Sequence, residues 1–515
     1  MTQELSSSDN ATDTSIALPV FLDGYPQVFT IDSFQIEEPV SYFSETLQPP
    51  LGLLIDKHGP LDWPFHLFPY QRDGVEALVT RASLLLADDM GLGKTLQAIA
   101  AIRVLAHQNH LERALVVSPA SLVIQWRKAF RQIAPELRLL TVEGPVSERA
   151  WQWQSQAHVF LVSYETLRQD ITDSPLSPPR RHRWDIVVLD EAQKIKNRDA
   201  DVSHRIKTLP RRKAWALTGT PLENRVDELA SILEFTRPLE PDGQVIHVYP
   251  GYKMQELHLH LQLRRKKAEV LPQLPPKLVS TVPLSLSRPQ RTAYDRAEHD
   301  GILDLKGKGD AVRIENVLEL IIRLKQICNF APSDDKSAKM DDLRDRLNTL
   351  VAEGHKAIIY SQFIDDQFGV MHVARLLADF RPLVYTGQLD SRERSQVIER
   401  FKTDPGRSVL VLSLRAGGLG LNLQEASYVF HFDRWWNPAV ETQAEDRAHR
   451  IGQSYPVNVY RYLCVDTIEE RIENILEEKR QLFDDIIDDV SFNLASRLTE
   501  KELYALFGLK PPKKA

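Results

Sequence analysis

The clearest chemical signal lies at Met90–Thr95, which reads MGLGKT, follows a short apolar run and opens a helical pattern. Small residues let backbone N–H groups converge on a phosphate, a lysine can reach the terminal phosphates of a nucleotide, and a hydroxyl can bind Mg²⁺. We therefore predict a phosphate-binding loop, named here the phosphate loop (Asp88–Thr95). Its binding candidates are Gly91, Gly93, Lys94 and Thr95. The general pattern has a glycine where this chain has Asp88.

A pair of acids follows the apolar run Ile186–Leu189, in the sequence DEAQ that begins at Asp190. Open parallel sheets bind ligands at the carboxyl ends of their strands, which is where this pair would lie. Asp190 is a candidate to hold Mg²⁺, largely through water, and Glu191 to orient or deprotonate an attacking water. Acids at strand ends are common and often only contact solvent. The pair therefore predicts a catalytic role only together with the phosphate loop about a hundred residues upstream.

Two arginines lie in QAEDRAHRIGQ, named here the arginine segment (Gln443–Gln453). Arg447 and Arg450 are three residues apart and therefore share one face of a helix. Such arginines can neutralise the charge that develops on a transferred phosphoryl group. The alternative is a solvated basic face, which the neighbouring acids Glu445 and Asp446 favour.

The elements that must position these residues are short apolar runs separated by helical patterns or loops. This alternation predicts βα units and parallel sheets. The rhythm breaks from about residue 237 to 340, where we expect a helical insertion and a linker, and then resumes. The predicted fold class is therefore α/β, with two doubly wound lobes and a small N-terminal extension. The predicted strands are Ser83–Ala87, Ala114–Ser118, Val159–Ser163, Ile186–Asp190, Ala214–Thr218, Ala357–Ser361, Val409–Ser413 and Tyr428–Phe432.

The composition is that of a globular protein, with 515 residues, 43% hydrophobic and 26% charged. It excludes a mainly disordered chain, a collagen-like repeat and a coiled-coil rod. No run approaches the roughly 20 apolar residues of a membrane span, and the polar start predicts no secretory signal. The two cysteines are expected to be reduced core thiols, and we expect no zinc site. The net charge of −7 gives no overall signal for nucleic acid.

Taken together, these residues resemble the Swi/Snf-type ATPases of helicase superfamily two, the translocases of double-stranded DNA. The resemblance covers about residues 65–490. The segments that carry it, besides DEAQ and the arginine segment, are FPYQ (Phe68–Gln71), ADDMGLGKT (Ala87–Thr95), SPASLVIQW (Ser118–Trp126), VSYETL (Val162–Leu167), LTGTPLEN (Leu217–Asn224), LRRKKAEVLPQLPPK (Leu263–Lys277), YSQF (Tyr360–Phe363), LRAGGLGLNL (Leu414–Leu423), FDRWWNP (Phe432–Pro438) and LTEKELYALFGL (Leu498–Leu509).

The resemblance implies ATP and Mg²⁺ as cofactors and extends the site. In the family a glutamine at the position of Gln71 reads adenine, which makes Gln71 the candidate for that role. The family also usually has an acid at the position of Asp88. The implied nucleotide contacts are Gln71, Asp88, Asp89, Met90, Gly91, Leu92, Gly93, Lys94, Thr95, Gly418 and Gly420. The implied catalytic set is Lys94, Asp190, Glu191, Gln443, Arg447 and Arg450. The implied DNA-backbone contacts are Ser118, Gln125, Arg127, Tyr164 and Arg415.

Domain boundaries follow from the same pattern. The expected parts are an N-terminal extension (1–60, partly disordered), the ATP-binding lobe (61–240), the linker with helical protrusions (241–340), the second RecA-like lobe (341–492) and a tail (493–515). The stretch 235–263 is short for the family and no accessory module is visible. This favours a bacterial or phage-related context, and we expect a cytoplasmic, nucleoid-associated motor whose target is set by a separate protein.

The leading hypothesis is an ATP-driven translocase on double-stranded DNA that remodels protein–DNA complexes. One alternative is a strand-separating DNA or RNA helicase, and another is a DNA-binding scaffold that uses ATP only as a switch. The complete catalytic set argues against the scaffold.

Three further segments allow two readings each. Arg205–Lys213 is either a DNA track or a solvated loop, and Arg264–Lys267 is similarly ambiguous. Trp435 and Trp436 could stack on bases, but packing in the core is favoured.

Overall fold

The computed structural model describes residues 18–22, 25–29, 54–56, 59–172, 177–219, 226–240, 243–414, 421–484 and 499–509. The chain divides into two units, Met1–Trp63 and Pro64–Ala515. In the first unit β1 (Leu18–Leu22) pairs antiparallel with β2 (Tyr25–Phe29). Residues 1–15, which we expected to be disordered, lie outside the described ranges.

The second unit contains two parallel sheets, and the first has seven strands in the order β5-β6-β4-β7-β8-β3-β9. Every residue of β4 and β6 is buried, which explains why these strands are unbroken apolar runs. The strands are β3 (Ser83–Leu86), β4 (Ala114–Ser118), β5 (Leu139–Val142), β6 (Val159–Ser163), β7 (Trp184–Asp190), β8 (Arg211–Leu217) and β9 (Gln262–Leu263).

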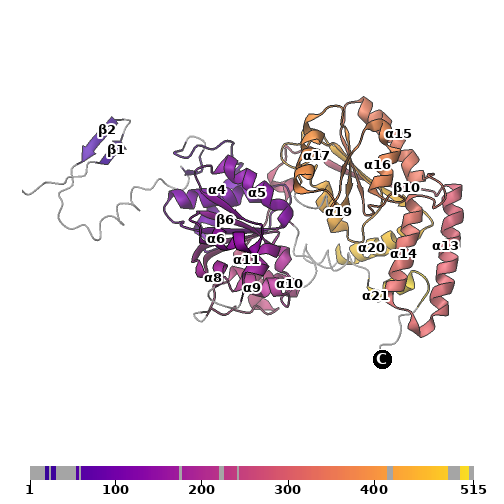
Figure 1. Cartoon of the computed structure of the whole chain (residues 1–515), viewed down its shortest axis with the longest axis horizontal. Coiled ribbons are helices and arrows are strands. Elements are labelled where there is room, and N and C mark those ends of the chain that lie inside the picture. The colour runs from indigo at the N-terminus through magenta and orange to yellow at the C-terminus, as the bar shows by residue number, and fades with distance from the viewer. Residues whose placement is uncertain are drawn as a thin grey trace, which may run out of the picture. The chain divides into compact units, whose positions relative to one another are not determined.

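Helices cover both faces of this sheet, with α4 (Lys94–His107) and α5 (Ala120–Ile133) on one side and most of the others on the opposite side (Figure 1). The opposite helices bury their apolar side chains in one cluster with the strands. The remaining helices of this lobe are α3 (Pro69–Thr80), α6 (Val146–Gln154), α7 (Tyr164–Asp170), α8 (Pro178–Arg181), η1 (Ala192–Ile195), α9 (Asp201–Lys207), α10 (Val226–Thr236) and α11 (Tyr252–Leu261).

The second sheet has six parallel strands in the order β10-β15-β14-β11-β13-β12. Its strands are β10 (Lys277–Leu284), β11 (Ala357–Ser361), β12 (Leu383–Tyr385), β13 (Val409–Ser413), β14 (Tyr428–His431) and β15 (Val457–Cys464). Its helices are α15 (Ala338–Ala352), α16 (Val370–Leu376), η3 (Ala378–Phe380), α17 (Ser391–Thr403), α19 (Pro438–Glu445) and α20 (Ile468–Asp484). The predicted fold class, two doubly wound lobes, is therefore confirmed.

The helical insertion is also present, as α13 (Arg288–Gly307), η2 (Gly309–Ala311) and α14 (Ile314–Asn329). Apolar side chains of α13 and α14 form one cluster with those of α20 and of the short tail helix α21 (Glu500–Ala505). The tail helix begins with a capping box, in which the Thr499 hydroxyl accepts from the backbone N–H of Glu502.

The connection between the lobes is shorter than the expected range 241–340. β9 belongs to the first sheet and β10 to the second, so Arg264–Pro276, which contains the one-turn helix α12 (Lys267–Val270), is all that separates them. The sequence pattern predicted neither strand, because β9 has only two residues and β10 is a largely exposed edge strand with Pro283 inside it. The first sheet thus includes a strand beyond the expected lobe boundary at residue 240, and the boundaries themselves stay predictions.

The basic segment Arg205–Lys213 is neither a solvated loop nor a free track. The ammonium of Lys207 is buried and lies 2.8 Å from a carboxylate oxygen of Glu234. Arg211 donates to backbone carbonyls, and burial lowers its pKa to about 9. Arg212 lies 3.2 Å from Asp185. Most of this charge therefore holds α9, β8 and α10 together.

The tryptophans Trp435 and Trp436 are partly buried and pack against two apolar clusters, as the core interpretation predicted. Both cysteines are buried and free. Among the described helices we find none that is both long enough and apolar enough to cross a bilayer.

Candidate active site

The phosphate loop joins β3 to α4 with a backbone that two glycines make possible. Gly91 and Gly93 have φ of +84° and +81°, a region that L side chains rarely adopt. A Cβ at Gly93 would lie 2.7 Å from Nε2 of Gln71, and a Cβ at Gly91 would lie 2.8 Å from Cβ of Arg450. Both positions therefore need glycine for their backbone and for their close neighbours.

Lys94 stands at the first position of α4 and its ammonium is turned back into the phosphate loop. Its Nζ donates to the backbone carbonyls of Asp88 and Asp89, at 2.6 and 3.0 Å. Burial lowers the pKa of Lys94, while Glu191 and Asp88 oppose that shift. The loop thus holds a partly buried cation that can exchange these carbonyls for phosphate oxygens.

The acid pair ends β7, as predicted. The carboxylate of Asp190 accepts from the indole N–H of Trp126 at 2.7 Å and from the backbone N–H of Glu191 at 3.1 Å. Burial, with the nearby charge of Glu191, raises the pKa of Asp190 to about 7. Asp190 therefore ionises readily only when a cation or another positive partner stands beside it.

Glu191 has φ of +51°, which is rare and costly for a residue with a side chain. Its carboxylate accepts from Nε2 of Gln193 at 2.6 Å. The same amide group accepts, through Oε1, from the hydroxyl of Thr218 at 3.1 Å. Gln193 therefore connects the acid to the end of β8, a link that the sequence did not reveal.

The two arginines of the second lobe face the phosphate loop across one cavity of about 290 Å³. The guanidinium of Arg450 donates to the carbonyl of Leu421 at 3.2 Å. Burial and the neighbouring charge of Arg447 lower the pKa of Arg450 to about 10, so it remains a cation at neutral pH. The lining includes Met90, Gly91, Gly93, Lys94, Thr95, Gln125, Trp126, Asp190, Glu191, Asn422, Arg447 and Arg450. Five of the six predicted catalytic residues thus share one cavity.

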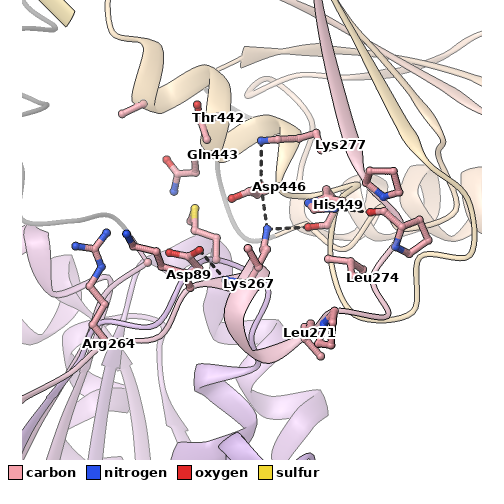
Figure 2. A pocket seen from close by; sticks show the side chains of 18 residues that line it. Asp89, Arg264, Lys267, Leu271, Leu274, Lys277, Thr442, Gln443, Asp446 and His449 are labelled. Carbon is pink, nitrogen blue, oxygen red and sulfur yellow. Dashed lines mark hydrogen bonds and ion pairs between the residues drawn. The ribbon is translucent and has the colours of Figure 1, made fainter. Parts of the chain in front are cut away.

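Gln443 is the sixth, and it lines a different cavity of about 630 Å³. Figure 2 shows Gln443 beside Thr442, with Asp89, Arg264 and Lys267 on the facing side. The phosphate loop borders both cavities, because Asp89 and Met90 line this second one. The predicted nucleotide contacts Gly418 and Gly420, and the whole turn 415–420, lie outside the described residues.

Gln71 lies against the phosphate loop, with both ends of its amide bonded to backbone. Nε2 donates to the carbonyl of Leu92 at 3.2 Å, and Oε1 accepts from the backbone N–H of Phe68 at 3.1 Å. Its side chain is 1% exposed. In this structure Gln71 braces the loop.

Asp88 has a partner that the sequence analysis missed. Its two carboxylate oxygens accept from Nε and Nη2 of Arg265, at 2.9 and 2.6 Å. Arg265 also donates to Gln97 at 2.9 Å and to the carbonyl of Tyr70. Asp88 is fully buried, and a buried carboxylate requires a cation nearby. The signal available in the sequence was an acid at the position where the general pattern has a glycine.

The predicted DNA contacts are not equally available. Ser118 is buried, and so is Tyr164, whose hydroxyl donates to the carbonyl of Asp190 at 2.8 Å. Neither side chain is exposed in this structure, and their contact with DNA stays a prediction. Gln125 lines the 290 Å³ cavity, and Arg127 lies at the surface 3.5 Å from Glu143. Arg415 lies outside the described residues.

The donor set of the 290 Å³ cavity fits Mg²⁺, which prefers a few oxygen ligands with water and phosphate completing its shell. Asp190 offers a buried carboxylate with the charge of Lys94 nearby, and Thr95 offers a hydroxyl. A second potential metal group is Cys328, Cys464 and Glu469. There the carboxylate oxygens of Glu469 already accept from Lys339 and from the backbone N–H of Cys464, so a cation would have to displace both.

Two family models match the chain. The SNF2-related domain matches residues 70–332 and the helicase conserved C-terminal domain matches residues 338–452. These ranges contain the phosphate loop with the acid pair, and most of the arginine segment, respectively.

Curated relatives extend the likeness over most of the chain. A putative ATP-dependent helicase/translocase of Bacillus subtilis is 34% identical over 481 residues, which are 86% of this chain and 51% of the relative. An uncharacterized ATP-dependent helicase of Mycoplasma genitalium is 35% identical over 465 residues, 86% of this chain and 44% of the relative. A human SWI/SNF-related regulator of chromatin, subfamily A member 1, is 32% identical over 441 residues, which are 77% of this chain and 41% of the relative. The chain spans about half the length of these relatives.

Among solved structures, the Sulfolobus solfataricus SWI2/SNF2 ATPase core in complex with double-stranded DNA is similar to this chain. The match has 29% sequence identity and a TM-score of 0.39, and it covers 88% of this chain and 99% of that one.

Proposed function

The chain belongs to the SNF2-related family, and from that premise we propose that it is a DNA-dependent ATPase that translocates along double-stranded DNA and remodels protein–DNA complexes. One observation carries the proposal. A phosphate loop, an acid pair and two arginines from the other lobe line a single cavity. This is the set of groups that hydrolysis of a nucleoside triphosphate requires.

The proposed reaction assigns each group one task. Glu191 orients the attacking water and takes its proton, and Gln193 fixes the direction of that carboxylate. Lys94 leaves the carbonyls of the loop for the terminal phosphates, and Arg447 with Arg450 neutralise the charge that develops on the γ-phosphate. Asp190 and Thr95 would hold Mg²⁺, which would supply neutralisation of the phosphate charge.

Movement follows from the division of the site between two lobes. ATP draws the arginines toward the phosphate loop. Hydrolysis followed by release of the phosphate product removes the charge that holds the lobes closed. The hydrogen bonds from Glu191 through Gln193 to Thr218 lead away from the cavity to the end of β8. If each lobe grips the DNA backbone, one cycle of closure advances the motor by one step.

The names of relatives support DNA as the track. Relatives from Bacillus subtilis and Mycoplasma genitalium are named ATP-dependent helicases, the first also a translocase, and the human one a regulator of chromatin. We propose contacts to phosphates and not to bases, with Gln125, Arg127 and Arg415 as candidates. Such contacts give little sequence preference and strong salt dependence.

The cellular setting is also a proposal. Two relatives come from bacteria, which supports a bacterial setting, and within it we propose action in the cytoplasm at the nucleoid. The described residues from Pro64 onward form the two lobes with their helical insertion and a short tail helix, and we propose that a separate protein supplies the target.

The experiment that tests translocation is the displacement of a third strand from a triplex. A labelled triplex-forming oligonucleotide is placed at one end of a long duplex, and ATP is added with the protein. We expect release of the third strand without separation of the duplex, and no release with Glu191→Gln. Release of duplex strands would identify the helicase alternative, and ATP turnover without release of any strand would contradict translocation.

A further inference from the structure

The segment Leu263–Lys277, which connects the lobes, is bonded at its beginning to the phosphate loop. The backbone N–H of Asp89 donates to the carbonyl of Arg265 at 3.0 Å, and that of Ala87 to the carbonyl of Leu263 at 2.8 Å. The carboxylate of Asp89 accepts from the backbone N–H of Lys267 at 3.0 Å. The phosphate loop and the start of the connection therefore move as one piece.

The end of the same segment is bonded to the arginine segment. The ring of His449 is hydrogen-bonded to the carbonyl of Pro275 at 2.8 Å. The ammonium of Lys277 lies 3.0 Å from Glu445 and 3.4 Å from Asp446. Because Lys277 begins β10 of the second sheet, these bonds lie on the side of the second lobe.

Lys267 spans the two ends by itself. Its backbone N–H is bonded to the phosphate loop, while its ammonium lies 2.9 Å from Asp446 and donates to the carbonyl of His449 at 2.8 Å (Figure 2). Its side chain is 10% exposed, and burial lowers its pKa while Asp446 opposes that shift. The partners of this buried ammonium offset the cost of burying its charge. Removing either partner would therefore destabilise the arrangement strongly.

The partners of Lys267 flank the arginines in the chain. Asp446 precedes Arg447, and His449 precedes Arg450. Lys267 holds the side chain of Asp446 and the carbonyl of His449, which lie within one turn. These contacts fix the backbone from which both guanidinium groups extend. The phosphate loop and the arginine segment approach closely, since a Cβ on Gly91 would lie 2.8 Å from Cβ of Arg450. A shift of about 1 Å in a catalytic group can cost about a hundredfold in rate.

We propose that Lys267 is a positioning residue for ATP hydrolysis, which sets Arg447 and Arg450 against the phosphate loop by linking Asp89 to Asp446 and His449. The inference rests on the proposed ATPase activity. Lys267 itself lines the 630 Å³ cavity and does not line the one that holds the arginines, so it acts through them.

The first test is Lys267→Met, which removes the charge and keeps most of the side-chain volume. We expect kcat for ATP to fall at least about tenfold while KM changes less than about threefold, because the lost interaction positions the reacting groups. Asp446→Asn breaks the same link from the other side and carries the test if Lys267→Met fails to fold. Lys267→Arg, which restores the charge, is expected to recover part of kcat.

Lys277→Met is the matched control. It also removes a cation from Asp446, but from within the second lobe. We expect it to lower the unfolding midpoint and to change kcat less than about threefold. Equal losses of kcat in the two variants would overturn the proposal, because the charge of Asp446 and not the link between lobes would then matter.

The second test is non-additivity. In an Arg450→Lys background, Lys267→Met is expected to cost less than about twofold in kcat, because its effect passes through the arginines. Independent, multiplied losses would contradict the proposal. Failure of the proposed function is seen separately, as wild-type protein that does not hydrolyse ATP.

Discussion

At the residue scale, the carboxylate of Glu191 is the group on which hydrolysis depends most directly. Glu191→Gln keeps the shape but cannot accept a proton, and a general base contributes about 10²–10⁴-fold. We expect turnover to fall by at least about a hundredfold while the affinity for ATP stays within a few-fold. Steady-state turnover and equilibrium binding of a fluorescent ATP analogue measure the two effects. Turnover at the wild-type rate would remove Glu191 from the mechanism.

Trp126 tunes the protonation of Asp190. Its hydrogen bond stabilises the carboxylate and so lowers the pKa of Asp190 from what burial alone would give. Removing the bond must therefore raise that pKa above about 7, and more of the carboxyl is protonated at neutral pH, where it cannot bind Mg²⁺. Trp126→Phe is expected to move the acid limb of the pH–rate profile to higher pH and to raise the Mg²⁺ requirement at pH 7.

The control is Trp153→Phe, which loses a similar bond to Asp170 at 2.8 Å, in a different part of the lobe. Its pH–rate profile should match the wild type even if its stability falls. A profile unchanged by Trp126→Phe would show that the indole does not govern the ionisation of Asp190.

What could be predicted for single residues depended on their spacing in the chain. Lys94, Asp190, Glu191, Arg447 and Arg450 stand in short local patterns, and the structure brings them into one cavity. Two supporting residues, Arg265 and Trp126, left no such pattern, because their bonds span long separations. Arg265 reaches Asp88 across 177 positions and Trp126 reaches Asp190 across 64.

At the scale of elements, the phosphate loop is held in shape by the ion pair between Arg265 and Asp88. Arg265→Met would leave a fully buried carboxylate without its cation. Breaking such a pair typically costs about 3–5 kcal/mol. We expect a loss of that order in the free energy of unfolding, measured by urea denaturation.

Arg212→Met serves as the comparison for a surface ion pair of the same lobe. The side chain of Arg212 is 64% exposed and pairs with Asp185, so its loss should cost about 1 kcal/mol or less. If the two variants lost equal stability, the buried pair would not be what holds the loop.

The predictability of an element followed from its burial. The central strands β4, β6, β11 and β13 match their predicted bounds, because a strand covered on both faces must be apolar throughout. β9 and β10 gave no such signal, being very short and largely exposed. The sequence also did not predict that basic residues around α9 form buried ion pairs and hydrogen bonds, because it does not show which lysine faces an acid inside the fold.

At the scale of the whole molecule, the account predicts how turnover responds to salt. Contacts to DNA phosphates release counterions, so affinity falls steeply as salt rises. We expect the concentration of duplex that gives half-maximal stimulation to rise at least about tenfold between 50 and 200 mM salt, with little change in turnover without DNA. A midpoint independent of salt would argue that the protein does not track the phosphate backbone.

The most direct test of the central claim is the rate of ATP hydrolysis by the wild-type protein without nucleic acid and with duplex DNA, single-stranded DNA or RNA. The account predicts low turnover alone, strong stimulation by duplex DNA, and no turnover on any track for Glu191→Gln. Turnover that duplex DNA does not raise, or that only single strands or RNA raise, would contradict it.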